Sequence, residues 1–443
     1  MSYSIEKITQ VVSAERYGDT AASISFLLTD SRSLCFPEET LFFALHTDRN
    51  DGHHYIPELY RRGVRNFVVE NVPNNFSDLY KHANFLKVGN TLAAFQQLAT
   101  FHRKAFNIPI VGITGSNGKT MVKEWLSQLF SYDMNVTRSP KSYNSQIGVP
   151  LSLWLLNENS QIGLIEAGIS KVGEMQALHD IIMPTVGVLT SIGTAHQENF
   201  SSLKEKCNEK LLLFKGTQAL IYRIDDKIAA NCVAETCYDG ELLAWSEHDT
   251  TAAFYVERIE KSNTTSTIHY IWKHSTHGNF ILPFIDDASI SNCITCAVVA
   301  LYFGMQPEVL AQRMAKLEPV AMRLEVKEGQ HGCTLINDSY NSDINSLNIA
   351  LDFMNRRPDQ KHRERTLILS DIYQSGETEE QLYAEVAVMV KERGIKKFIG
   401  VGKALNRQKQ AFGSLKDKFF FENTADFIES NVFKTLHNEV ILL

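Results

Sequence analysis

The chain has 443 residues, of which 44% are hydrophobic and 21% charged, a composition typical of globular rather than disordered proteins. At about 100–200 residues per domain, this length predicts three domains, each able to bury a core of its own. The 44 Lys and Arg against 51 Asp and Glu give a net charge of −7. This balance argues against a general binder of nucleic acid or membrane surfaces, but not against an anionic ligand held by a few local groups.

The cysteines and apolar residues predict a cytoplasmic protein. Seven cysteines, an odd number, are scattered from Cys35 to Cys333, as expected for reduced thiols rather than a disulfide framework. No apolar run approaches the ~18 residues that a membrane-spanning helix needs, and the first residues lack the pattern of a secretory signal. Cys293 and Cys296 form a C-x-x-C pair in an apolar helical stretch, and we interpret them as core thiols.

Residues 1–104 are expected to form a small α/β domain. Short apolar runs predict strands, and polar stretches such as 56–63 between them predict helices. The predicted strands cover residues 24–28, 41–45, 67–69 and 85–88.

Residues 105–317 are expected to form a central domain with a doubly wound parallel sheet. The run IPIVGIT predicts a strand that leads directly into GSNGKT. After it, apolar residues recur on one stripe of a helix, namely Met121, Val122, Trp125, Leu126, Leu129 and Phe130. Further strands are predicted at residues 163–166, 186–190 and 219–222. Strands that alternate with helices indicate a parallel sheet with crossover helices.

Residues 318–443 are expected to form a Rossmann-like third domain. Strands are predicted at residues 334–336, 366–369 and 398–401, and helices at residues 346–354 and 382–393. The chain stops at EVILL, which has the pattern of a buried strand. We therefore expect this domain to be truncated and the natural polypeptide to continue.

The segment from Gly112 to Thr120 predicts a nucleotide site. A strand leads into a glycine-rich turn, and the turn opens a helix, which is how backbone N–H groups come to surround phosphates. Lys119 would reach the β- and γ-phosphates, and the Thr120 hydroxyl would bind Mg²⁺. Ile113 stands where the strict Walker pattern has glycine. The residues predicted to bind the nucleotide here are Gly115, Ser116, Asn117, Gly118, Lys119 and Thr120.

TGSNGKT after a strand, with about 110 residues before it, resembles the Mur ligases, the ATP-dependent enzymes that form amide bonds in peptidoglycan precursor synthesis. The resemblance implies two Mg²⁺ sites and a lysine carbamylated by CO₂. Glu166 lies at the end of a predicted strand, as the family's metal-binding acid does. His196 matches the histidine of T-N-I-x-x-A-H, with Ser191 in place of the asparagine.

The carbamylated lysine cannot be chosen from composition, because three lysines lie close together. The family has this lysine just before an apolar segment. Lys210 precedes Leu211–Phe214 and occupies that position, and Lys206 is the alternative. A carbamate turns a cation into an anionic oxygen ligand, which suits a hard metal ion.

The resemblance also implies contacts with the rest of ATP. Asn292 matches the family's adenine-facing asparagine, although Asp286 and Ala288 replace the glycine and histidine of that motif. Arg323 resembles an arginine near the phosphates. Asp338 and Asn341, in the segment INDSYNSDINS, resemble the ATP-contacting D-D-x-Y-N motif.

Two further segments indicate the substrates. The strings DSR at 30–32, FFAL at 42–45 and DGH at 51–53 resemble the motifs with which the front domain of two Mur ligases binds the UDP-sugar end of the substrate. The segments NSQIGVP and ILSDIYQSGE resemble those of the ligase that adds D-alanyl-D-alanine to UDP-MurNAc-tripeptide. The implied substrate residues are Ser31, Arg32, Asp51, His53, Asn144 and Ser145.

Four other functions stay open. A related Mur ligase would add the third amino acid of the peptide. A folylpolyglutamate synthase shares the phosphate loop but lacks such a front domain. A nucleotide-binding regulator would need the loop without Glu166, His196 and Lys210. An inactive ligase-like domain is the last, given the substitutions at residues 191, 286 and 288. In some bacteria this ligase is fused to an alanine racemase, which here would lie beyond residue 443.

Overall fold

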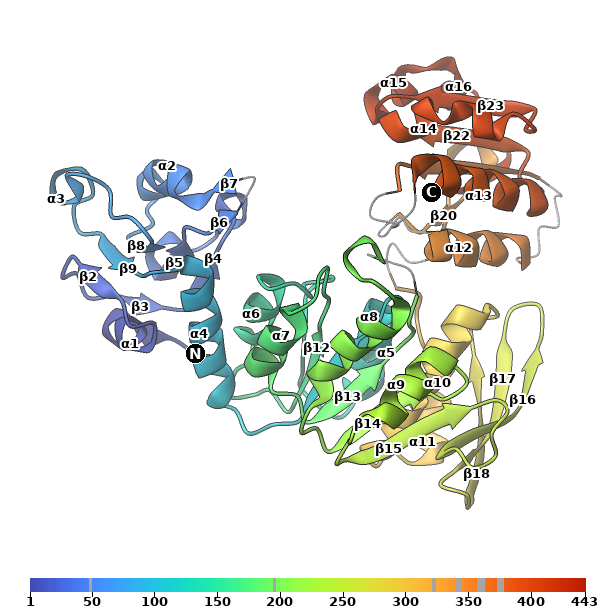
Figure 1. The fold of residues 1–443 in the computed structure, drawn as a ribbon, viewed down its shortest axis with the longest axis horizontal. Coiled ribbons are helices and arrows are strands. Elements are labelled where there is room, and N and C mark those ends of the chain that lie inside the picture. The colour runs from blue at the N-terminus through green and yellow to red at the C-terminus, as the bar shows by residue number, and fades with distance from the viewer. Residues whose placement is uncertain (48–49, 194–196, 321–323, 340–343, 357–362, 373–377) are drawn as a thin grey trace. The chain divides into compact units, whose positions relative to one another are not determined.

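The computed structural model describes residues 1–47, 50–193, 197–320, 324–339, 344–356, 363–372 and 378–443 (Figure 1). Its contacts divide the chain into two compact units. The first consists of Met1–Gly112, Met134–Gly168 and Glu174–Thr185, and the second of Ile113–Asp133, Ile169–Gly173 and Val186–Leu443. The division into domains at residues 104 and 317 stays a prediction.

The first unit contains a five-stranded sheet in the order β2-β9-β8-β5-β4, parallel except for β2. Its strands are β2 Glu15–Tyr17, β4 Phe26–Leu28, β5 Thr40–Phe43, β8 Asn66–Val69 and β9 Asn84–Lys87. Alternate residues of a strand face opposite sides. Phe43 and Val68 therefore belong to one core, with α1 (Ile5–Val11) and α4 (Thr91–Lys104), and Phe42 and Phe67 to another, with α2 (Ile56–Arg61).

The remaining elements of the first unit are short. They are β1 Tyr3–Ser4, β3 Ser23–Ile24, β6 His46–Thr47, β7 Asn50–Asp51, α3 Phe76–Leu79, β11 Val136–Arg138, α6 Gly148–Leu153, β12 Ile162–Glu166 and α7 Glu174–Ile182. β11 pairs in parallel with β12, and both belong to a nine-stranded sheet in the order β11-β12-β10-β13-β14-β15-β16-β17-β18.

The other strands of this sheet are β10 Ile110–Thr114, β13 Val186–Leu189, β14 Ala219–Arg223, β15 Glu241–Ser246, β16 Phe254–Lys261, β17 Ser266–Trp272 and β18 Thr276–Leu282. The strands from β13 to β16 pair in parallel, whereas β16, β17 and β18 form an antiparallel meander. The associated helices are α5 Lys119–Phe130, α8 Leu203–Leu211, α9 Lys227–Glu235, α10 Asp287–Tyr302 and α11 Pro307–Met314.

The C-terminal part of the second unit is a six-stranded sheet in the order β19-β20-β24-β21-β22-β23, parallel except for β19. Its strands are β19 Glu325–Glu328, β20 Thr334–Asn337, β21 Glu364–Ser370, β22 Lys397–Val401, β23 Asp417–Phe421 and β24 Glu439–Leu442. Its helices are α12 Ile344–Arg356, α13 Glu379–Glu392, α14 Lys403–Arg407, α15 Thr424–Glu429 and α16 Asn431–Lys434.

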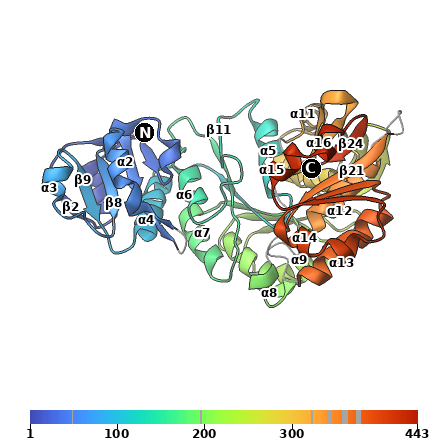
Figure 2. The ribbon, with the colours of Figure 1, turned by 90° about the horizontal axis from the view of Figure 1, so that it is seen from above.

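Helices cover both faces of this six-stranded sheet. Figure 2 shows α12, α13 and α14 on one side and α15 and α16 on the other. Phe398 and Leu442 belong to the core with α12 and α13, whereas their neighbours Ile399 and Ile441 pack with Phe427 of α15. This alternation confirms the predicted α/β class, with helices on both faces of a mostly parallel sheet.

All seven cysteines are free thiols. None of the helices in the described ranges is long and apolar enough to cross a bilayer.

Candidate active site

The phosphate loop lies between β10 and α5, and its glycines fit the conformation it adopts. Gly118 has φ +86°, and Gly115 has φ +150°. A Cβ at Gly115 would come within 2.0 Å of the Thr190 hydroxyl oxygen, and a Cβ at Gly118 within 2.4 Å of Asn292 Oδ1. No side chain caps the start of α5. The loop thus combines a close backbone approach with a helix N-terminus, the arrangement that binds phosphate.

Lys119 places its ammonium over this loop. Its Nζ donates to the carbonyl oxygens of Gly115 and Ser116, each at 2.9 Å. The cation is therefore next to the backbone turn where phosphate oxygens need charge neutralisation. Asn292 is brought to the same loop, because its amide lies against Gly118.

The segment after β13 is hydrogen-bonded to the phosphate loop. The Ser116 N–H donates to the Ser191 carbonyl at 2.6 Å, and the Gly193 N–H donates to Ser116 Oγ at 2.9 Å. The Thr190 hydroxyl donates to the Asn117 carbonyl at 2.5 Å, and the Ser191 hydroxyl to the same oxygen at 3.3 Å. Two loops from neighbouring strands therefore support each other.

The next helix, α8, carries the candidate lysines. Lys206 and Lys210 are buried, at 1% and 3% exposure, whereas the Lys204 side chain is 58% exposed and pairs with Glu235. Burial, followed by the charges of Lys119 and Lys206, holds the pKa of Lys210 well below its ordinary value. Because CO₂ adds only to an unprotonated amine, Lys210 fits the predicted carbamate chemistry.

Glu166, the predicted metal-binding acid, is buried at the end of β12 in the first unit. Asn144 Nδ2 donates to its Oε1 at 2.8 Å, and its own N–H donates to Ser139 Oγ at 3.1 Å. The structure thus brings together Glu166 and one of the predicted substrate residues. A buried, oriented carboxylate fits a hard cation such as Mg²⁺.

No group of three His, Cys, Asp or Glu within the described ranges could hold a metal ion. The predicted Mg²⁺ ligands are not a group of this kind, because two of the four, Thr120 and Lys210, are a threonine and a lysine. His196, the histidine among them, lies outside the described residues, as do Arg323 and Asn341.

In the front sheet's loops, the predicted substrate residues have intramolecular partners. The Arg32 side chain is 88% exposed and pairs with Asp30 at 2.7 Å. His53 Nδ1 lies 2.7 Å from Asp51 Oδ1, and its Nε2 accepts from the Glu70 N–H at 3.1 Å. Since Nε2 accepts, the proton is on Nδ1. The contact of Arg32, Asp51 and His53 with a substrate stays a prediction. The same holds for Ser31 and Ser145. The Oγ of Ser145 accepts a hydrogen bond from the Gly148 N–H.

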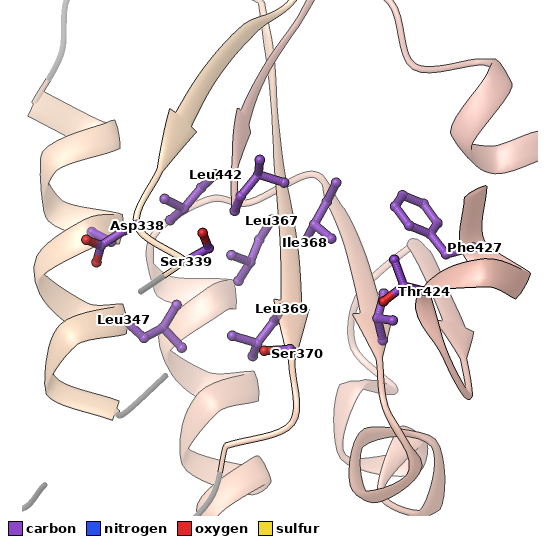
Figure 3. A pocket seen from close by; sticks show the side chains of 13 residues that line it. Asp338, Ser339, Leu347, Leu367, Ile368, Leu369, Ser370, Thr424, Phe427 and Leu442 are labelled. Carbon is purple, nitrogen blue, oxygen red and sulfur yellow. The ribbon is translucent and has the colours of Figure 1, made fainter. Parts of the chain in front are cut away.

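A cavity of about 300 Å³ lies in the C-terminal sheet, with Asp338 on its wall (Figure 3). Its lining comes from the ends of β20, β21 and β24, where open α/β sheets hold ligands. Figure 3 shows Leu347, Leu367 and Leu442 around the same space. The Leu324 N–H donates to Asp338 Oδ1 at 3.2 Å. The cavity is largely apolar, so it provides few groups for binding phosphate.

Asp286 differs from the glycine expected in the adenine motif, and the structure gives it a capping role. Its Oδ1 accepts from the Ser289 N–H at 2.8 Å at the start of α10. Burial raises the pKa of this carboxyl. Gly193, which also holds the phosphate loop, could not be found from the sequence, because its contacts are made by its backbone N–H and carbonyl and have no residue signature.

Comparison with known proteins adds to this geometry. Residues 113–300 match the Mur ligase middle domain. UDP-N-acetylmuramoyl-tripeptide--D-alanyl-D-alanine ligase of Bacillus subtilis is 28% identical over 382 residues, covering 85% of this chain and 79% of the relative. The ligase of the same name from Escherichia coli is 25% identical over 412 residues, covering 91% and 86%. The chain therefore contains a Mur ligase middle domain.

Solved structures show a similar fold along most of the chain. UDP-N-acetylmuramoylalanyl-D-glutamyl-2,6-diaminopimelate--D-alanyl-D-alanyl ligase from Acinetobacter baumannii has a TM-score of 0.82 at 21% identity, covering 100% of this chain and 95% of that one. MurF ligase from Thermotoga maritima in complex with ADP has a TM-score of 0.74 at 19% identity, covering 94% and 92%.

Proposed function

We propose that this protein is a Mur ligase that joins D-alanyl-D-alanine to UDP-MurNAc-tripeptide in peptidoglycan precursor synthesis, with conversion of ATP to ADP and phosphate. The observation that carries the proposal is the likeness to ligases of that name along most of the chain, 91% of it for the Escherichia coli enzyme. Both ATP and the UDP-linked substrate are intracellular compounds, so we place the reaction in the cytoplasm. The fused alanine racemase domain stays a prediction.

The chemistry needs two steps, because a carboxylate is a poor electrophile. A terminal carboxylate oxygen of the tripeptide attacks the γ-phosphorus of ATP, and the bond from that phosphorus to the β,γ-bridging oxygen breaks, which releases ADP. The amine of D-alanyl-D-alanine then attacks the acyl carbon. The C–O bond to the phosphate breaks, the amine loses its proton, and phosphate leaves with the former carboxylate oxygen. Positioning and charge neutralisation supply most of the rate in such reactions.

The phosphate loop provides the positioning on the ATP side. Gly115, Ser116, Asn117 and Gly118 would direct backbone N–H groups at the phosphates, and Lys119 would neutralise charge on the transferred group. The remaining nucleotide contacts are assigned to Asn292, Arg323, Asp338 and Asn341.

Two Mg²⁺ ions would be held by Thr120, Glu166, His196 and a carbamate on Lys210. The burial of Glu166 and the lowered pKa of Lys210 support this assignment. When bound, the ions would stabilise negative charge on the phosphate oxygens. Lys210 supplies the nitrogen for the carbamate, and its burial, followed by the charges of Lys119 and Lys206, lowers its pKa and so favours the unprotonated amine.

The test is phosphate release with UDP-MurNAc-tripeptide, D-alanyl-D-alanine, ATP and Mg²⁺, omitting each in turn. Release that requires all four supports the proposal. Release with a single amino acid in place of the dipeptide would indicate the ligase that adds the third residue. Release without any acceptor would indicate a plain ATPase, and absence of release would indicate an inactive domain.

A further inference from the structure

Lys206 is a buried lysine to which the proposed reaction assigns no contact with a substrate or a metal ion. It lies on α8 four residues before Lys210, and only 1% of it is exposed. Its Nζ donates to the Gly193 carbonyl oxygen at 2.6 Å and lies 5.8 Å from the centre of the Phe200 ring. The ammonium therefore contacts the chain on both sides of the segment that contains His196.

Gly193 is in turn hydrogen-bonded to the phosphate loop. The Ser116 hydroxyl donates to the Gly193 carbonyl at 3.0 Å and accepts from the Gly193 N–H at 2.9 Å. The Gly193 carbonyl thus receives hydrogen bonds from Lys206 and Ser116 together. Lys206, Gly193 and Ser116 form a continuous connection from α8 to the loop that holds the phosphates.

A contribution to the stability of the fold does not by itself explain why a lysine is buried at position 206. Removing an ammonium from water is costly, and apolar side chains of similar volume often stabilise a buried site as well or better. A charge-assisted hydrogen bond does, however, fix geometry more strictly than apolar contact. The contacts of Lys206 therefore favour a role in orienting its neighbours.

We propose that Lys206 is a positioning residue for the nucleotide: by holding the Gly193 carbonyl, it fixes Ser116 and the phosphate loop in the conformation that receives the phosphates. This inference rests on the proposed function only in that the loop binds ATP. It also separates the tasks of the two α8 lysines, because carbamate oxygens on Lys206 would face the Gly193 carbonyl with like charge.

The experiment measures affinity for Mg·ADP by calorimetry, which needs no ligase turnover, together with affinity for UDP-MurNAc-tripeptide. Lys206→Met removes the ammonium and keeps the length of the side chain. Lys204→Met is the matched control, because Lys204 lies on the same helix but is mostly exposed. Lys206→Arg restores a cationic donor.

We expect Lys206→Met to weaken Mg·ADP binding about tenfold or more, as the loss of one charged hydrogen bond implies. The affinity for the UDP substrate should stay unchanged, Lys204→Met should match the wild type, and Lys206→Arg should recover most of the loss. Equal ADP affinity in Lys206→Met and the wild type would overturn the inference, and so would a parallel loss of both affinities.

Lys206→Leu serves as a second variant if Lys206→Met does not fold, since it also removes the hydrogen-bond donor and fills the buried space. An ADP affinity below that of the wild type supports the inference, and an unchanged affinity overturns it. A wild-type protein that binds ADP but forms no amide would contradict the proposed function and leave this inference standing.

Discussion

Lys206 and Lys210 lie one helical turn apart on α8, and both are buried, yet they are suited to different chemistry. Lys206 donates to the Gly193 carbonyl at 2.6 Å. Burial and two neighbouring cations disfavour the charged form of Lys210, and its pKa is lowered accordingly. The lowered pKa of Lys210 therefore supports its assignment as the carbamylated lysine.

Replacing Lys210 with alanine should lower phosphate release at least about a hundredfold, because the metal loses an anionic oxygen ligand. Adding a small carboxylate such as formate should restore part of the activity by occupying the vacated space. Phosphate-release kinetics check both effects, and Lys204→Ala is the control on the same helix. Full activity in Lys210→Ala would contradict the carbamate assignment.

A second residue-scale prediction concerns His102, which is 1% exposed in the first unit. Its Nε2–H donates to the Leu156 carbonyl at 3.0 Å, and its Nδ1 accepts from the Tyr3 hydroxyl at 2.9 Å. Burial lowers the pKa of His102 to about 4 from its ordinary 6.5. At pH values between these two, His102 binds a proton in the unfolded chain but not in the folded chain. The free energy of unfolding therefore falls as the pH falls.

The difference amounts to about 3 kcal/mol in the free energy of unfolding between pH 7 and pH 4. Denaturant unfolding at several pH values measures it, with His102→Gln as the comparison, since glutamine does not titrate. An equally steep loss of stability in His102→Gln would show that other groups cause it.

At the scale of elements, the strand–loop–helix unit around Gly118 depends both on its local sequence and on the contact of Gly118 with Asn292, which is distant in the chain. The glycine-rich turn and the apolar stripe of α5 could be predicted, because both are local.

The antiparallel strands β16, β17 and β18 were not predicted. Their buried residues alternate with less buried ones, as in Val256, Ile268 and Tyr270. Such alternation over a few residues is a weak signal without knowledge of the pairing strand.

Gly118→Ala should weaken ATP binding and destabilise the second unit. The left-handed backbone alone costs about 1 kcal/mol for alanine, and the new Cβ would also displace Asn292. Gly304→Ala is the matched control, because Gly304 has φ +85° and open space around its Cα. Nucleotide titration and thermal unfolding compare the two variants. Equal ATP affinity in both would contradict the close approach of Asn292.

At the scale of the whole molecule, β24 is the last strand in the chain but lies inside its sheet. It pairs in parallel with β20 on one side and β21 on the other, and all four of its residues are buried. Sequence analysis identified EVILL as a buried strand from composition. Its place between two earlier strands could not be predicted, since strand order depends on long-range pairing.

Deleting residues 439–443 should unfold the C-terminal sheet, because β20 and β21 would lose their common neighbour. Limited proteolysis with mass spectrometry should then show rapid cleavage within residues 324–438, while the front sheet of the first unit stays protected. Unchanged protection of the C-terminal sheet would show that β24 is dispensable.

The candidate site shows the same division between local and long-range information. The strand, glycine-rich turn and helix of the phosphate loop could be predicted, because they are local. Glu166 and Lys210 were chosen by resemblance to the family, and their roles stay predictions. The contacts of Lys206 with Gly193, and of Gly193 with Ser116, could not be predicted. They join segments 13 and 77 residues apart through backbone atoms, and such contacts leave no residue pattern.

The most direct test of the proposed ligase reaction follows one oxygen atom. UDP-MurNAc-tripeptide with ¹⁸O in its terminal carboxylate is converted with ATP and D-alanyl-D-alanine, and the released phosphate is analysed by mass spectrometry. Activation through an acyl phosphate transfers one carboxylate oxygen to each phosphate, so the account predicts one ¹⁸O per phosphate formed. Phosphate without ¹⁸O would show that water attacks ATP or that another bond is activated, and it would contradict the proposed ligase mechanism.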